Sequence, residues 1–166
     1  MTVTVFGTGT LHAVAVDEWP ARPDPVPDLV VNTREFGFVA EMTASLETFS
    51  AVRGLTLSVP ASFGADPDLA ESAQLVVSEL MGNVMRASPE NERVPLIVEV
   101  YATSTGIEVI VHDAVPERPH RRDVALDSTE AVSGRGLALI DMLTDGWTVE
   151  PSPLGKKIRC HLSSAE

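Results

Sequence analysis

The chain has 166 residues, of which 44% are hydrophobic and 22% charged, and its formal net charge is −12. This length and composition predict one soluble globular domain that folds without disulfides or a structural metal. The acidic excess disfavours direct binding to nucleic acid or to an anionic membrane surface. The single cysteine, Cys160, cannot form an internal disulfide, and no signal-like start or long apolar run is found, which favours a cytoplasmic protein.

The first 31 residues differ in pattern from the rest. Two weakly alternating segments, Thr2–Phe6 and Leu11–Val16, predict a small hairpin, and four prolines follow within a few residues of each other. The predicted organisation is an extension with a stiff linker at 1–31, a domain at 32–162 and a tail at 163–166.

Beyond residue 35, hydrophobic periodicity predicts strands and helices in a regular order. The predicted strands are Phe36–Met42, Leu96–Ala102, Ile107–Asp113, Trp147–Glu150 and Lys156–Leu162. The predicted helices are Thr43–Leu57, Asp68–Ala87 with Asp68 as its N-cap, and a segment from near Gly134 to near Gly146, with a loop at Pro60–Asp68. These elements predict an α+β fold, a two-layer sandwich with helices on one face of a mixed, mostly antiparallel sheet.

Glu79 and Asn83 lie on the border of the apolar stripe of the long helix. Because they are four residues apart, both side chains project from the same helix edge. An amide oxygen at Asn83 can bind Mg²⁺, and a carboxylate at Glu79 can act as a general base. A solvated helix edge without a ligand is the alternative interpretation.

Asp113 ends the strand Ile107–Asp113 on the face that points inward. An ionised carboxylate in that position needs hydrogen-bond donors, because burying it unpaired is costly. The exocyclic amine of adenine would supply such a donor. Alternatively, Asp113 caps the loop that follows the strand.

The segment Ser133-Gly134-Arg135-Gly136-Leu137 opens the last predicted helix. Its glycines let the backbone come close to a ligand, and the first amides of a helix attract a phosphate. Arg135 would either support the phosphate charge or remain solvated. A flexible helix start is the alternative.

The order of these segments along the chain resembles the ATPase fold shared by gyrase, histidine kinases and mismatch-repair proteins. The resemblance rests on Val76–Asn83, Val111–Asp113, Ser133–Leu137 and Gly155–Ile158, and it covers about residues 35–162. Within that fold, the chain is most similar to the anti-sigma-factor serine/threonine kinases and related ATP-binding regulators of actinobacteria.

The resemblance implies ATP and Mg²⁺ as cofactors. It implies Glu79 as the general base, Asn83 as the Mg²⁺ ligand and Asp113 as the acceptor for the adenine amine. The full nucleotide-binding set that it implies is Asn83, Asp113, Ser133, Gly134, Arg135, Gly136 and Leu137.

Residues 114–133 would be the ATP lid of such a protein. This stretch has no apolar periodicity and many charged side chains, so it is predicted to be poorly ordered until nucleotide binds.

The implied activity is phosphorylation of a serine on an anti-anti-sigma partner, together with sequestration of a sigma factor. Relatives commonly dimerise through the region that corresponds to Phe36–Leu57, so a homodimer is also expected. Three departures favour an alternative, a partner-binding regulator without catalysis, with or without ATP. Asp113 is not followed by glycines, Val132 stands where active kinases often have arginine, and Lys157 replaces a threonine expected beside adenine.

Overall fold

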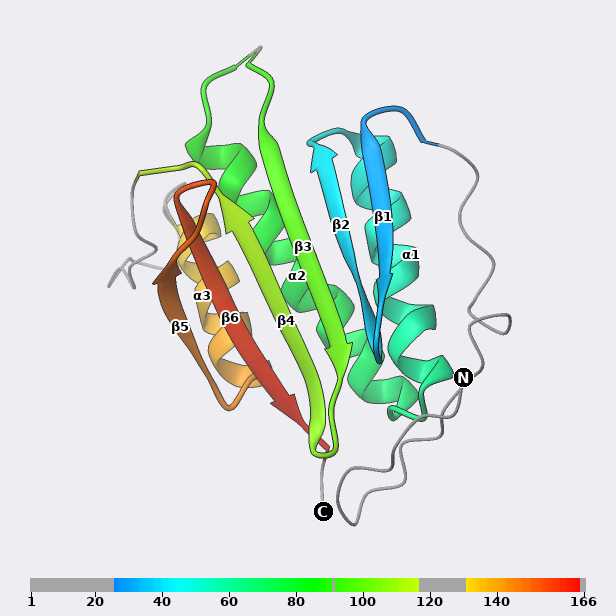
Figure 1. Cartoon of the computed structure of the whole chain (residues 1–166). Helices are drawn as coiled ribbons and strands as arrows, with labels where there is room; N and C mark the ends of the chain where they lie inside the picture. The colour runs from blue at the N-terminus through cyan, green and yellow to red at the C-terminus, as the bar shows by residue number, and fades with distance from the viewer. Residues whose placement is uncertain (1–25, 91, 117–130, 165–166) are drawn as a thin grey trace.

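The computed structural model describes residues 26–90, 92–116 and 131–164, in which one sheet is covered on one face by helices (Figure 1). The strands are β1 (Leu29–Arg34), β2 (Gly37–Thr43), β3 (Pro95–Ala102), β4 (Gly106–Asp113), β5 (Gly146–Pro151) and β6 (Lys156–Ser163). The helices are α1 (Leu46–Ser62), α2 (Pro67–Ala87) and α3 (Ala131–Leu143). No helix in these ranges has both the length and the apolar character needed to cross a membrane.

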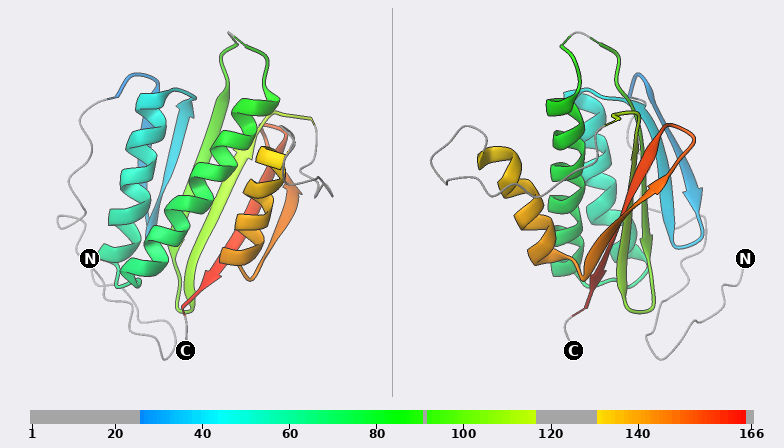
Figure 2. Two further views of the ribbon diagram at one scale, coloured as in Figure 1. Left: turned by 180° about the vertical axis from the view of Figure 1, so that it is seen from behind. Right: turned by 90° about the vertical axis from the view of Figure 1, so that its left-hand side faces the viewer.

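The six strands are arranged in the order β1-β2-β3-β4-β6-β5, and each neighbouring pair is antiparallel. Seen from the side, the helices form one layer and the sheet the other (Figure 2). The predicted α+β sandwich, with its helices on one face, is therefore confirmed. The two predicted strands at 96–102 and 107–113 form a hairpin, in which β3 and β4 pair from Leu96 with Asp113 to Ala102 with Ile107.

α2 is the central helix of the helical layer and lies between α1 and α3 (Figure 2). Its inner face is apolar, and burying each such large side chain stabilises the fold by about 1.5–3 kcal/mol. The buried residues of α2 are Ala70, Ala73, Val76, Val77, Leu80, Met81 and Val84. This packing fixes the rotation of α2, so its polar edge has a defined direction. Ala87, the last residue of the helix, is exposed.

α1 is longer than the sequence predicted, because it continues through Pro60 to Ser62. A proline in the last turn removes only one helical hydrogen bond near an end that is already incompletely bonded. The Pro60 ring is buried, which offsets that loss. At the other end, Ser45 and Thr48 form a capping box.

The N-cap of α2 lies two residues earlier than the sequence suggested. It is Asp66, whose side chain accepts a hydrogen bond from the Asp68 backbone N–H at 2.9 Å. The prediction that Asp68 caps the helix was therefore wrong. Pro67 explains the difference, because proline is well suited to the first helical position, where its missing N–H costs nothing.

The edge strand β1 was not predicted. The sequence assigned Leu29–Val31 to the N-terminal extension, whereas in the structure these residues pair with β2. Partial burial of Leu29 and Val31 against the core supports this pairing, which the weak alternation of the segment does not reveal. The hairpin predicted within residues 2–16 lies outside the described residues.

The open face of the sheet carries a hydrogen-bonded polar network. The Tyr101 hydroxyl donates to Glu99 Oε1 at 2.6 Å, and His112 Nε2 lies 2.6 Å from Glu99 Oε2. His112 Nδ1 lies 2.8 Å from the hydroxyl of Ser152, which begins the turn between β5 and β6. The network therefore connects β3, β4 and that turn.

The network also changes the acidity of its members. Burial by itself would raise the pKa of Glu99, but the hydrogen bonds from Tyr101 and His112 outweigh burial and hold that pKa below its ordinary value. Burial and the nearby Glu99 carboxylate raise the pKa of Tyr101. In the core, burial raises the pKa of the Cys160 thiol to about 12.

We predict that Glu99→Gln destabilises the protein near neutral pH by about 1–2 kcal/mol, because a charge-assisted hydrogen bond is replaced by neutral ones. The pKa of Glu99 is lower in the folded protein than its ordinary value of 4.5. The stabilisation by its carboxylate is therefore fully present above pH 4.5 and is lost as the pH falls through the pKa of the folded state. Urea unfolding at neutral and at acidic pH measures it. The exposed Glu41 on β2 provides the control, Glu41→Gln. An equal loss at both pH values would contradict the prediction.

Candidate functional site

Glu79 and Asn83 lie one turn apart on the edge of α2 that faces α3, and both side chains are partly buried. α3 approaches this edge through Gly136. A Cβ atom at Gly136 would lie 2.6 Å from Glu79 Oε2 and 3.5 Å from Asn83 Oδ1. Any larger residue there would displace the Glu79 carboxylate. Gly136, which is distant in sequence, thus meets Glu79 and Asn83 at one place.

Arg86 belongs to the same edge and was not singled out from the sequence. Its Nη2 atom donates to Asn83 Oδ1 and lies 3.8 Å from Glu79 Oε2. The spacing of seven residues from Glu79 places Arg86 two turns further along the same helix face, which is a signal the sequence did contain. The arginine brings a positive charge to a group of oxygen ligands.

α3 begins at Ala131, three residues before the predicted start near Gly134. Ser133 and Gly134 are therefore in the first turn, where backbone N–H groups lack helical partners, and Gly136 is in the second turn. Gly136 allows α3 to approach α2 closely, because it has no side chain. Leu137, assigned to the nucleotide by resemblance, is buried in the hydrophobic core. The side chains of Ser133 and Arg135 lie outside the described part of the structure.

Asp113 ends β4 and its side chain is only 1% exposed. Its Oδ1 atom accepts hydrogen bonds from Lys156 Nζ at 2.6 Å and from the Val115 backbone N–H at 2.8 Å. Its Oδ2 atom is buried and has no hydrogen-bond partner among residues 26–90, 92–116 and 131–164. A buried acceptor without a donor is costly. Asp113 therefore has one oxygen available to an N–H or O–H group of a ligand.

Lys156 is the first residue of β6 and is paired directly with Asp113 in the sheet. Its side chain is only 12% exposed, and its ammonium group donates both to Asp113 Oδ1 and to the Val115 carbonyl at 2.6 Å. The resemblance had suggested that Lys157 stands beside the base. Instead, alternation along β6 places Lys157 on the opposite face, 3.7 Å from Glu150 Oε2.

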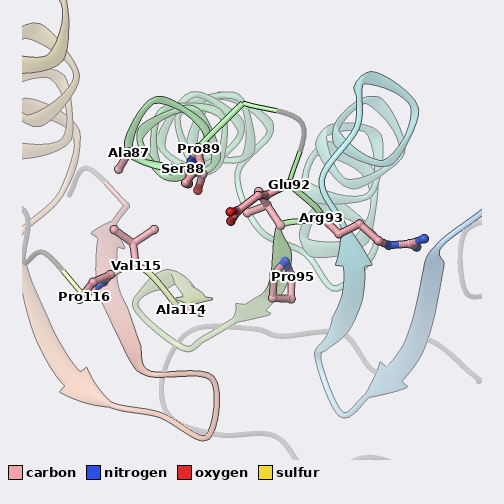
Figure 3. A pocket seen from close by; sticks show the side chains of 10 residues that line it. Ala87, Ser88, Pro89, Glu92, Arg93, Pro95, Ala114, Val115 and Pro116 are labelled. Carbon is pink, nitrogen blue, oxygen red and sulfur yellow. The ribbon is translucent and has the colours of Figure 1, made fainter.

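A pocket of about 210 Å³ lies between the end of α2, the start of β3 and the residues after β4 (Figure 3). Its lining includes Ala87, Glu92, Pro95 and Val115. In Figure 3 the Glu92 and Val115 side chains point into this space, whereas Arg93 extends away toward β1, where it pairs with Asp28. Val115 belongs both to the pocket lining and to the hydrogen bonds around Asp113.

One elongated ligand can span the separation between the edge of α2 that carries Glu79 and Asn83 and the pocket at the end of the same helix. Glu79 and Ala87 are eight residues apart on α2, or about 12 Å, since an α-helix rises about 1.5 Å per residue. Hard oxygen ligands and a glycine lie at one end, suited to a metal ion and phosphate. A pocket and a buried carboxylate lie at the other, suited to a ring with an amino group. Most of the predicted lid, residues 117–130, lies outside the described residues.

Comparison with known proteins identifies the family to which this fold belongs. Residues 42–161 match the family model of the histidine kinase-like ATPase domain, a stretch that runs from β2 into β6 and contains the whole site. No curated protein matches the sequence. Because the matched region makes up well over half of the chain, the protein belongs to the histidine kinase-like ATPase domain family.

Proposed function

We propose that this protein is an ATP-binding anti-sigma regulator that phosphorylates a serine of an anti-anti-sigma partner and sequesters a sigma factor. The observation that carries the nucleotide part is the buried Oδ2 atom of Asp113, which has no hydrogen-bond partner among the described residues, next in sequence to Ala114 and Val115, which line a pocket. The regulatory part is supported by the segments Val76–Asn83 and Ser133–Leu137, which resemble anti-sigma kinases.

The residues of the site fit ATP and Mg²⁺. Asp113 would accept the adenine amine, and the Asn83 amide oxygen would hold the metal ion, with Gly136 leaving room for phosphate next to α2. When bound, Mg²⁺ would neutralise phosphate charge, and Arg86 would add to that neutralisation from the same helix edge.

Glu79 would act on the substrate hydroxyl. Phosphoryl transfer depends mainly on positioning and charge neutralisation, with one group accepting the proton of the attacking serine. Burial of the apolar face of α2 holds Glu79 on the helix edge that faces α3. Gly136 has no side chain, so it leaves the Glu79 carboxylate unobstructed.

We expect Asp113→Asn to weaken ATP binding by about tenfold to a hundredfold, because an amide can replace only part of the acceptor capacity of the carboxylate. Isothermal titration of the folded variant with Mg-ATP measures the change. Asp68→Asn, an exposed position at the far end of α2, is the control and should leave affinity unchanged. Equal affinity of wild type and Asp113→Asn would exclude Asp113 from the nucleotide site.

Gly136→Ala should reduce Mg-ATP affinity by about tenfold or more, because its Cβ would displace the Glu79 carboxylate 2.6 Å away. Gly54→Ala on α1 is the matched control. A Cβ there meets no atom within 4 Å, and the substitution should stabilise the helix by about 0.5–1 kcal/mol. Titration and thermal unfolding of both variants separate the local clash from a general helix effect. Unchanged binding by Gly136→Ala would show that this contact is not part of the site.

Kinase activity is tested with radiolabelled ATP and anti-anti-sigma proteins of the native host. Glu79→Gln should abolish transfer while binding of ATP persists, since only the proton acceptor is lost. Asn83→Ala should reduce both binding and transfer, since the metal ligand is lost. If Glu79→Gln transferred the label to the partner as the wild type does, Glu79 would not be the proton acceptor.

A second function, a partner-binding regulator without catalysis, is favoured by one feature of the site. The chain's own cations already engage the groups assigned to the ligand, Arg86 at Asn83 and Lys156 at Asp113. Proteins of the native host that bind to this chain are captured with and without ATP. ATP binding without phosphoryl transfer to any captured partner would support this second function.

The same capture experiment tests whether a sigma factor binds, and sedimentation tests the proposed homodimer.

A further inference from the structure

The ion pair between Asp113 and Lys156 leaves one hydrogen-bonding group free on each side. Asp113 Oδ1 already accepts two hydrogen bonds, whereas Oδ2 accepts none from the part of the chain that the structure describes. The Lys156 ammonium has three N–H donors, and two of them are used within the described residues, by Asp113 Oδ1 and the Val115 carbonyl. The pair therefore offers one acceptor and one donor from the same buried position.

The lysine is held in place by the backbone around it. Gly155, just before it, has φ 154°, and a Cβ at that position would lie 3.0 Å from the Asp113 carbonyl oxygen. The turn that contains Gly155 is closed by backbone hydrogen bonds with Ser152 of 3.0 and 3.2 Å, and Ser152 also contacts His112. This support limits the positions that the Lys156 side chain can take and favours a recognition role, because an oriented donor loses little entropy on binding.

We propose that Lys156 and Asp113 together read the edge of the adenine base. Asp113 Oδ2 accepts an N–H of the 6-amino group, and Lys156 donates its remaining N–H to the ring nitrogen N1. This inference rests on the proposed function, because it requires that the site binds ATP. It assigns to Lys156 a part in base selection that the sequence analysis did not give to it.

The number of free hydrogen-bond donors and acceptors on Asp113 and Lys156 favours adenine over guanine. The Watson–Crick edge of adenine presents one donor beside one acceptor, which corresponds to the one free acceptor and the one free donor of the pair. Guanine presents two adjacent N–H donors and one carbonyl acceptor. Only one carboxylate oxygen is free for those two donors, since Oδ1 is already saturated. An unsatisfied donor in a buried site reduces affinity.

The wild-type protein is titrated with Mg-ATP and two analogues. 1-Deaza-ATP has a C–H in place of N1 and tests the contact with Lys156, and purine riboside triphosphate lacks the 6-amino group and tests the contact with Asp113. Each analogue should bind about tenfold or more weakly than ATP, and GTP should also bind more weakly. Binding of ATP with no loss for 1-deaza-ATP would overturn the inference while the proposed function stands. Preferred binding of GTP would overturn the adenine assignment.

Lys156→Met, compared with Lys157→Met, assigns the discrimination to its residue. The two substitutions remove the same charge from adjacent residues on opposite faces of β6. Lys156→Met should bind ATP and 1-deaza-ATP with equal affinity, whereas Lys157→Met should keep the wild-type ratio. A wild-type ratio in folded Lys156→Met would reduce Lys156 to a counterion of Asp113 and overturn the inference.

A second measurement does not depend on the folding of Lys156→Met, which removes one partner of a buried ion pair. Lys156 and Lys157 are the only lysines of the chain, so ¹⁵N-lysine labelling gives two side-chain signals, assigned with Lys157→Met. The Lys156 ammonium signal should shift with ATP and much less with 1-deaza-ATP. Equal shifts with both nucleotides would overturn the inference, and no binding of any nucleotide by wild type would overturn both it and the proposed function.

Discussion

Burial of the apolar face of α2 against the sheet is the interaction on which the site depends. Val76, Val77 and Leu80 are fully or almost fully buried, so α2 cannot rotate without exposing large apolar surface. The same rotation that buries these side chains directs Glu79 and Asn83 toward α3. The polar edge is therefore positioned mainly by the packing energy of the apolar face. α1 supports this arrangement from the other side, where Gln74 of α2 donates to the Arg53 carbonyl at 3.2 Å.

The chain is strongly acidic, yet its site is organised by two basic side chains. Arg86 lies among the oxygen atoms of Glu79 and Asn83, and Lys156 lies against the buried Asp113. Transferring a carboxylate such as Asp113 into the interior is costly unless a cation and hydrogen bonds compensate. The compensation is incomplete, because Oδ2 remains without a donor. A site that is nearly neutralised but keeps one unmet hydrogen bond is suited to a ligand that supplies a single N–H group, and such a ligand would gain affinity from completing it.

The two faces of the sheet contribute to one site. β4 carries Asp113 on the helix side and His112 on the open side, and consecutive residues of a strand point in opposite directions. His112 contacts Ser152 at the start of the β5–β6 turn, and that turn leads directly into Lys156. Hydrogen bonds on the open face therefore help to hold the turn that presents the lysine to Asp113. The network around Glu99 is thus connected, through His112, Ser152 and the turn that follows it, to the residue that faces Asp113 on the other side of the sheet.

The amino-acid sequence by itself determined the fold class, most element positions, the inward direction of Asp113 and the pairing of Glu79 with Asn83 on one helix edge. These features follow from local periodicity, in which a residue's face is set by its own position in a strand or helix. Tertiary structure decided what local periodicity cannot express. β1 exists because β2 offers a pairing edge, and Gly136 meets Glu79 because two helices pack side by side. Lys156, rather than Lys157, faces Asp113 because the register between β4 and β6 pairs those two residues. A shift of one residue would reverse that choice, and the register is set by contacts between segments that lie far apart in the chain.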